Sequence, residues 1–353
     1  MILWLGLLLC LTLWGASFRR DGIAAYYISR DGTNAVRGVF ILLILSMHFT
    51  QYVSASADPA VTAFWAVRRF FDQLAVCMFL FYSGYGVALS FAEKGEGYRK
   101  SFLQKRMLPT LMAYDVSVLL FILIECTVGE GCSFGYCLRA LLAWESMGND
   151  NWYIFVILGL YGISWLSACV QVRCFGKISA AWMIGGVTLG TAAFALFLSA
   201  AGRREFWYNT IVCFPFGVLF CYVRSRAERA LEKPLPYWVS LFAVLGLFLL
   251  LNGTLRQRHV LLYMLTALSF AALVLLVTMK LSVRNRLLIL AGEHLNALFL
   301  VHRIPMRLLG EIRAVRERVY LYFALSVACA IGCAWLFEKL LALLRRKKPA
   351  RGQ

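Results

Sequence analysis

The chain of 353 residues is 61% hydrophobic and only 15% charged. Soluble domains are nearer half apolar and a quarter charged, so this composition, with a mean hydropathy of +0.72, excludes an ordinary soluble protein. The net charge of +18 is spread over short segments between apolar runs. That spread excludes a nucleic-acid-binding domain and favours membrane orientation and contact with anionic lipid.

Apolar stretches long enough to cross a bilayer follow one another along the whole chain. We predict eleven spans, near residues 1–18, 36–53, 73–92, 108–128, 151–172, 179–200, 207–223, 237–252, 259–279, 287–302 and 319–344. Their long continuous runs are typical of helices and lack the alternation of a β-barrel. The sequence therefore predicts an all-α, polytopic membrane protein, in which any chemistry takes place within the helical bundle or at its mouths.

The flanking charges predict how the bundle is oriented. The first stretch has no basic residue before it and is followed by Arg19 and Arg20, which favours an uncleaved helix with its N-terminus outside over a signal peptide. Basic loops at 94–106, 224–233 and 280–286 fall on one side together with the tail at 345–353, so that side should be cytoplasmic. The outward segment 303–318 is an exception, because its five arginines either bind an anionic substrate or headgroup or indicate a miscounted tenth span.

The eleven cysteines do not form a metal-binding pattern, because no Cys-x-x-Cys pair has a matching His or second pair. No metal site is predicted. Cys126, Cys132 and Cys137 flank one predicted outward loop, where a disulfide could form. Most of the others lie within spans, where cysteine packs as a small apolar residue.

Arg37 and His48 are the most informative residues in the chain, because nothing ionisable separates them in the second span. Eleven residues at about 100° each return a helix to within about 20° of its starting face, so both side chains lie on one face, roughly 16 Å apart along the axis. A histidine within the membrane is costly and is often functional. It can transfer a proton at neutral pH, or it can bridge two helices by hydrogen bonds.

Several motifs, taken in order, resemble the acyltransferase-3 family of bacterial membrane acyltransferases. That family has Arg or Lys, ten residues and then His in the first of ten helices, as in the segment from Thr33 to His48 here. Further resembling segments are Leu80–Tyr85, the basic stretch Phe102–Pro109, Asn151–Tyr153, Trp207–Thr210 and Leu298–Pro305. This chain departs from the family by an extra first helix and by a basic stretch reduced to Lys105 and Arg106.

The resemblance implies three regions in the chain. An N-terminal helix and its cytoplasmic connection would occupy residues 1–32, a ten-helix acyltransferase-3-like domain residues 33–344, and a basic cytoplasmic tail residues 345–353. The protein would then lie in the bacterial cytoplasmic (inner) membrane. No permanently bound cofactor is expected.

The resemblance also implies an activity. In this family an acyl group, usually acetyl from acetyl-CoA, passes to a hydroxyl or amine of an envelope glycan, a lipid-linked sugar or a similar acceptor. CoA is polyanionic and cytoplasmic, so Arg37, Lys105 and Arg106 are expected to hold its phosphates. His48 would either deprotonate the acceptor or carry the acyl group.

Other residues are candidate acceptor contacts with an equally ordinary structural interpretation. Trp152, Tyr153 and Trp207 could stack on a sugar or serve as interfacial aromatic residues. Ser83 could contact substrate or, with Gly84, allow close helix packing. The remaining candidates are polar residues in or near spans, namely Asp115, Asn209 and His302.

A transporter or flippase for an envelope precursor is the main alternative function. The sequence argues mildly against it, because it shows no inverted repeat and no broken helices at matching positions. An interaction subunit with an inactive site would be favoured had Arg37 or His48 been replaced, and both are present.

Overall fold

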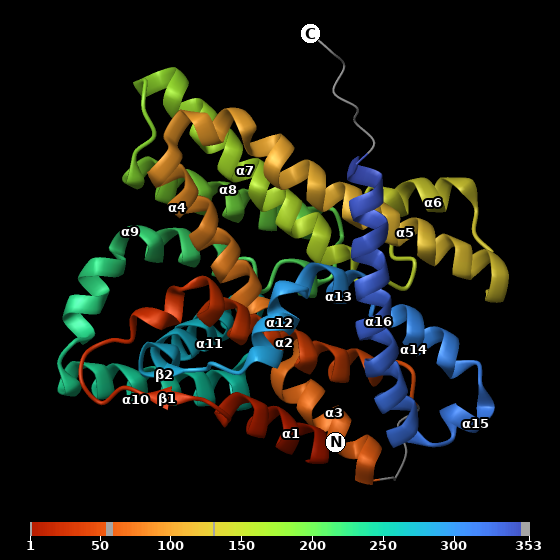
Figure 1. Cartoon of the computed structure of the whole chain (residues 1–353). Helices are drawn as coiled ribbons and strands as arrows, with labels where there is room; N and C mark the ends of the chain where they lie inside the picture. Colours follow the sequence, from red (N-terminus) through yellow and green to blue (C-terminus); the bar gives the residue numbers. More distant parts are fainter. Residues whose placement is uncertain (1, 54–58, 130, 347–353) are drawn as a thin grey trace.

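The computed structural model describes residues 2–53, 59–129 and 131–346, which are almost entirely helical (Figure 1). The first half contains α1 (Ile2–Leu13), α2 (Arg30–Phe49), α3 (Pro59–Phe71), α4 (Cys77–Phe102), α5 (Leu108–Val128), α6 (Phe134–Leu141), α7 (Asn151–Phe175) and α8 (Ala180–Ala200). The second half contains α9 (Cys213–Leu231), α10 (Pro234–Leu250), α11 (Val260–Lys280), α12 (Arg286–Glu293), α13 (Leu295–Val301), α14 (Arg303–Gly310), α15 (Arg313–Arg316) and α16 (Val319–Arg346).

Short elements join these helices. Single turns of 3-10 helix occur at η1 (Ala25–Ile28), η2 (Asp72–Val76) and η4 (Glu205–Trp207), and π-helical turns at η3 (Leu103–Met107) and η5 (Leu251–Leu255). The only strands in the described ranges, β1 (Ser17–Phe18) and β2 (Leu281–Ser282), pair antiparallel with Ser17 opposite Ser282. The predicted all-α class is therefore confirmed for this part of the chain.

Within the described residues, seven helical stretches are long and apolar enough to cross a membrane, or eight if the bent pair formed by α12 and the helix from Leu295 to Gly310 counts as one span. The expected number of eleven is not reproduced. Helix α1 has only 12 residues, and the end of α9 carries Arg224, Arg226, Glu228 and Arg229. The spans expected at 73–92 and 108–128 fall within one helical run, Val61–Val128, of 68 residues.

Two helix pairs are packed so closely that only glycine fits at their contacts. In the α2–α12 pair, a Cβ on Gly38 would overlap the backbone of Leu288, and one on Gly292 would overlap the backbone of Asn34. In the α4–α9 pair, Gly84 and Gly217 meet the partner backbone in the same reciprocal way. Small residues allow this approach within a membrane, where van der Waals contact replaces the hydrophobic effect between helices. The packing role considered for Gly84 is thus observed.

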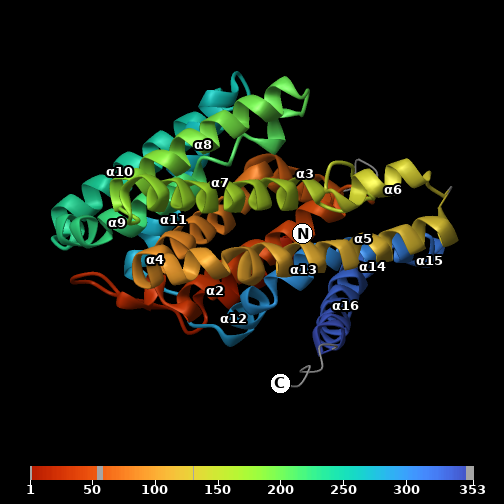
Figure 2. The same cartoon turned by 90° about the horizontal axis from the view of Figure 1, so that it is seen from above.

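Seen from above, α7 and α8 lie along one flank of the bundle, α2 and α12 lie along the other, and α4 and α5 run between them (Figure 2). Three of the expected cytoplasmic segments contact one another, namely the connection before α2 and the loops at 224–233 and 280–286. Tyr27 Oη donates to Glu228 Oε1 at 2.7 Å, and the Arg19 N–H donates to the Lys280 carbonyl at 2.8 Å. These contacts lie at the end of the bundle opposite α6, α14 and α15 (Figure 1).

Candidate active site

A cluster of two histidines, one carboxylate and one guanidinium lies where α2, α7 and the α13–α14 junction meet. His48 Nδ1 is 2.7 Å from His302 Nε2 and 3.2 Å from Asp150 Oδ2. The other carboxylate oxygen, Asp150 Oδ1, accepts a hydrogen bond from Arg303 Nη2 at 2.8 Å. His302 and Asp150 are buried, while the His48 side chain keeps 20% of its surface exposed. Of the two histidines, His48 is therefore the one that a substrate can reach.

The hydrogen bonds of His302 determine which nitrogen of His48 is free. His302 Nδ1 lies 3.0 Å from the carbonyl oxygens of Leu298 and Phe299. Carbonyls only accept, so this nitrogen carries the proton, and in a neutral ring Nε2 is then an acceptor. His48 Nδ1 must therefore donate to His302. The other nitrogen of His48, Nε2, is left with a lone pair and receives no hydrogen bond from any described residue.

Local sequence accounts for the position of each member. His48 lies in the last turn of α2, whose start is capped by Ser29. His302 lies at the junction of α13 and α14, in the segment that bends by 66° from α12. Arg303 follows directly as the first residue of α14.

Asp150 lies at the end of a tight turn in front of α7. The Ser146 hydroxyl donates to the Asn149 carbonyl at 2.7 Å, and the Asn151 amide donates to the Ala143 carbonyl at 2.9 Å. Gly148 adopts a φ of +89°, which favours glycine. The carboxylate is thus placed at a helix N-terminus, where negative charge is favoured.

The electrostatics keep Asp150 ionised. Burial by itself raises the pKa of this carboxyl, but the Arg303 guanidinium and His48 outweigh burial and hold its pKa well below its usual range. A carboxylate that stays charged can stabilise a positive charge on the adjacent imidazole. The cluster has the parts of a histidine base with an acidic partner.

The same three residues are the group that could hold a metal ion, since ligand atoms of His48, Asp150 and His302 all lie within 4.8 Å of one another. The spacing of the two rings argues for a shared proton instead. Two nitrogens bound to one tetrahedral Zn²⁺ at about 2.0–2.1 Å would be separated by about 3.3 Å, whereas here the nitrogens are 2.7 Å apart. The observed arrangement is that of a hydrogen-bonded pair.

A second site surrounds Arg37, toward the other end of α2. A cavity of about 200 Å³ is lined by Arg37, Phe79, Ser83, Arg106, Thr110, Tyr153, Ile154, Ile157, Tyr161, Leu295, Asn296 and Phe299. The Arg37 guanidinium lies 5.2 Å from the centre of the Tyr82 ring, and Arg106 Nε donates to Tyr98 Oη at 3.1 Å. Within the described ranges no carboxylate forms an ion pair with either arginine. Two cations without acidic partners are typical of an anion site.

The wall of this cavity continues to the histidine cluster. Tyr153 follows Asp150 by three residues, and its ring centre is 5.0 Å from that of Phe299. Phe299 in turn lies 6.3 Å from the His302 ring and supplies one of the carbonyls that fix its proton. The two sites predicted on one face of α2 are thus joined by aromatic side chains.

The predicted site residues fall into two groups. Arg37, Ser83, Arg106 and Tyr153 line the cavity, and His302 contacts His48. The other predicted residues lie elsewhere, namely the exposed Lys105, Trp152 against Phe206, Trp207 against Trp144, Asp115 in α5 and the buried Asn209.

Asp150 and Arg303 are site residues that the sequence did not single out. Asp150 stands in the turn-type segment Gly148–Asn151, and Arg303 is one of five arginines in the basic segment 303–318. One signal in the sequence could have indicated Asp150. It is an acidic residue directly before the predicted span 151–172, on the membrane side where the span that contains His48 is expected to end.

Two polar cavities open beside the cluster at the end where α6, α14 and α15 lie. The first, of about 460 Å³, is lined by Gln51, Tyr52, Gly148, Arg303, Arg307, Gly310, Glu311, Arg316 and Tyr322. The second, of about 430 Å³, is lined by Glu125, Gly131, Cys132, Ser133, Tyr136, Arg139, Ser146, Met147, Gly148 and Arg307. They share Gly148 and Arg307 and so form one groove, called here the outer groove. Its wall includes Arg303, which contacts Asp150.

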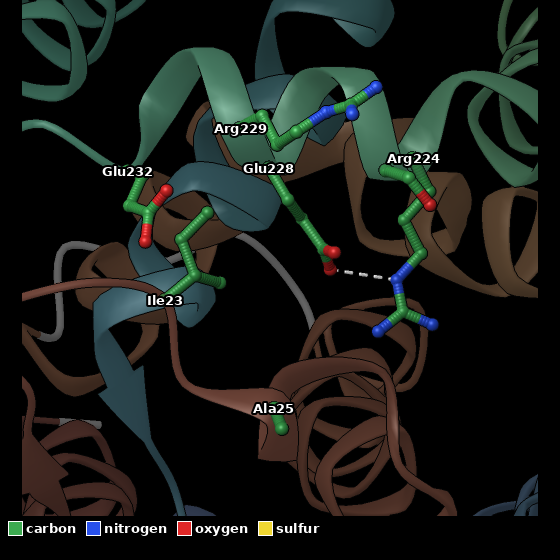
Figure 3. Close-up of a pocket in the computed structure, with 7 residues that line it drawn as sticks. Ile23, Ala25, Arg224, Glu228, Arg229 and Glu232 are labelled. Carbon is green, nitrogen blue, oxygen red and sulfur yellow. Dashed lines mark hydrogen bonds and ion pairs between the residues drawn. The ribbon is translucent and has the colours of Figure 1, made fainter.

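Another cavity, of about 440 Å³, lies at the opposite end and contains none of these residues (Figure 3). Here Arg224 Nε donates to Glu228 Oε1 at 2.8 Å and Arg224 Nη1 donates to Tyr85 Oη at 3.1 Å. Because Tyr27 donates to the same carboxylate, the network ties the connection before α2 to α9. The paired residues Arg224 and Glu228 of this cavity thus hold two segments of the fold together.

The fold and these sites define a class, a helical membrane protein built around a buried histidine–carboxylate cluster. Comparison with known families then identifies which one. The acyltransferase domain family Acyl_transf_3 matches residues 30–339, nearly the whole chain. The chain belongs to the acyltransferase-3 family, as its motifs predicted. Searches of curated proteins and of solved structures found no match.

Proposed function

We propose that the protein transfers an acyl group, acetyl from acetyl-CoA, to a hydroxyl of an envelope glycan, a lipid-linked sugar or a similar acceptor. The observation that carries this proposal is the free Nε2 of His48, whose opposite nitrogen is held by His302 and lies beside Asp150. A base fixed in this tautomer can accept a proton from an alcohol without first reorienting. The family supplies the reaction class, and the site supplies the residues.

In the proposed reaction, His48 Nε2 takes the proton of the acceptor hydroxyl as its oxygen attacks the thioester carbonyl. The tetrahedral intermediate collapses by breaking the carbon–sulfur bond, and the departing CoA thiolate takes the proton back from His48. Asp150 stabilises the transient imidazolium, while Arg303 keeps the carboxylate in place. Acyl transfer through His48 itself would use the same nitrogen, and trapping of a labelled acyl-enzyme without acceptor distinguishes the two routes.

The donor would reach His48 from the Arg37 cavity. Two arginines without acidic partners suit the phosphates of CoA, since guanidinium groups bind phosphate oxygens bidentately. A volume of about 200 Å³ is too small for a whole CoA, so the cavity would hold only the part that enters the bundle. Lys105, being exposed, would contribute at most to attraction at the entrance.

The acceptor would bind in the outer groove. Its walls combine arginines, tyrosines and serines with two carboxylates, Glu125 and Glu311, and such side chains hydrogen-bond hydroxyl-rich molecules. The proposed orientation has the donor side cytoplasmic, the N-terminus outside and the C-terminus cytoplasmic, in the inner membrane of a bacterium, as the flanking basic residues predict.

The test measures transfer of radiolabelled acetyl from acetyl-CoA in membranes containing the protein, together with mass spectrometry of envelope glycans and lipids from cells with and without the gene. We expect His48→Ala to abolish transfer while the protein remains inserted. The matched control is His259→Ala, because that exposed histidine caps α11 far along the chain from the cluster. Full transfer by the His48 variant would refute the assignment. An unchanged acyl pattern with accumulated precursor would instead identify a transporter.

A further inference from the structure

Three cysteines lie at the connection between α5 and α6, beside the outer groove. Cys132 and Cys137 bracket the start of α6, and their sulfurs are 3.0 Å apart. Cys126 lies near the end of α5 and is exposed. Two thiols in such contact are positioned to be joined with little movement of the backbone.

The first turn of α6 brings these two sulfurs together. Ser133 caps the helix, with its hydroxyl accepting from the Tyr136 N–H at 3.4 Å, and the Cys137 N–H donates to the Ser133 carbonyl at 3.0 Å. Because the turn is hydrogen-bonded in this way, residues 132 and 137 are held on the same side of it. The proximity of the thiols is therefore a property of a regular helix start.

Helix α6 also supports the turn that carries Asp150. Tyr136 Oη donates to the Ser146 carbonyl at 2.6 Å, and the Ser146 hydroxyl donates to the Asn149 carbonyl at 2.7 Å. From the other side, Tyr114 Oη donates to the Ala140 carbonyl at 2.8 Å. The start of α6 thus lies two hydrogen bonds away from the residue that precedes Asp150.

We propose that Cys132 and Cys137 form a disulfide on the outer side of the membrane, and that this bond fixes the start of α6 and, through Tyr136, the turn that holds Asp150 against His48. Its formation depends on the outward placement of this loop, and its effect on activity rests on the proposed function. Disulfides persist in the space outside the bacterial inner membrane and are rare inside it.

The bond would form by thiol–disulfide exchange with a disulfide-carrying oxidant of that compartment. The thiolate of one cysteine of the pair bonds to one sulfur of the oxidant and releases the other as a thiol. The sulfur of the second cysteine then displaces the remaining oxidant thiol, so that two protein thiols lose two protons and two electrons and the oxidant disulfide gains both.

The first test detects the Cys132–Cys137 disulfide directly in the full-length protein. Membranes are alkylated, digested and analysed by mass spectrometry before and after reduction. We expect a linked peptide pair containing Cys132 and Cys137, with Cys126 alkylated in both samples. Free thiols at both positions, or a bond from Cys126 to either of them, would overturn the proposal. This readout does not depend on acyl transfer, so it stands even if the proposed function fails.

The second test measures how the disulfide affects the Asp150 turn and acyl transfer. Hydrogen exchange of the peptide covering residues 143–150 should accelerate on reduction, and acyl transfer should fall by about tenfold as the Asp150 turn loosens. The double variant Cys132→Ser with Cys137→Ser should match the reduced protein and no longer respond to reductant. Cys329→Ser, an exposed thiol in α16, is the matched control. Exchange unaffected by reduction would refute the link to Asp150.

Discussion

Replacing Asp150 by asparagine tests the electrostatic part of the site with almost no change of shape. The carboxylate oxygen lies 3.2 Å from His48 Nδ1. At an effective dielectric constant of about 20, two unit charges at that distance attract by about 5 kcal/mol. The asparagine carbonyl, with about half a unit of negative charge, retains roughly half of this attraction, so the imidazolium of the transition state loses about 2–3 kcal/mol. Acyl transfer by Asp150→Asn should therefore fall about 30-fold to 150-fold.

The assay compares single-turnover acetyl transfer by wild type and Asp150→Asn in the same membranes. Acetyl-CoA binding should stay within about twofold, because the loss acts on the transition state and not on the Arg37 cavity. The control variant is Glu338→Gln, which breaks a histidine–carboxylate pair of 2.8 Å with His294 outside the site. A transfer rate within threefold of wild type for Asp150→Asn, with the protein folded, would refute the role given to the carboxylate.

Three further predictions concern binding, packing and pH. Arg37→Ala should weaken acetyl-CoA binding about tenfold and make the binding less dependent on salt, both measured by calorimetry. The control Lys100→Ala removes an exposed residue paired with Glu96 and should change acetyl-CoA binding little. Gly38→Ala should lower the free energy of unfolding by about 1–3 kcal/mol, because the added Cβ meets the α12 backbone. The control Gly97→Ala lies in open space within α4 and should leave the free energy of unfolding unchanged or raise it. The pKa of Asp150 is lowered on folding. The ionised carboxylate therefore stabilises the folded state above about pH 3.9, the pKa of an unfolded aspartate, and this stabilisation is lost as the pH falls further. The difference in melting temperature between wild type and Asp150→Asn should therefore be constant from about pH 5 to 8 and shrink below about pH 4.

Features that depend on the geometry of a single helix could be predicted from the sequence. Residues eleven apart return to one face of an α-helix, so Arg37 and His48 could be assigned to one surface before any packing was known. The small residue at Gly84 indicated close helix contact, which the structure shows against the α9 backbone. The Arg106 side chain, predicted with Arg37, also lines the same cavity.

Predictions that required distances between helices were less complete. Lys105 stands next to Arg106 in the chain but is exposed, because neighbouring helix positions point about 100° apart and only one of them can face the cavity. Asp150 was not predicted as a site residue, because its role depends on a histidine 102 positions earlier in the chain. Turn composition describes the local backbone and says nothing about which helix packs beside it.

The sequence by itself determined the membrane setting, the all-helical class, the family and the shared face of Arg37 and His48. These follow from composition, from the 3.6-residue period and from short motifs, which are all local properties of the chain. Only the tertiary structure decided that His302, 254 residues from His48, is its hydrogen-bond partner, and that Asp150 and Arg303 complete the cluster. The physical reason is that the tautomer of His48 is set by groups on other helices, and those groups are brought together by packing that no local pattern encodes.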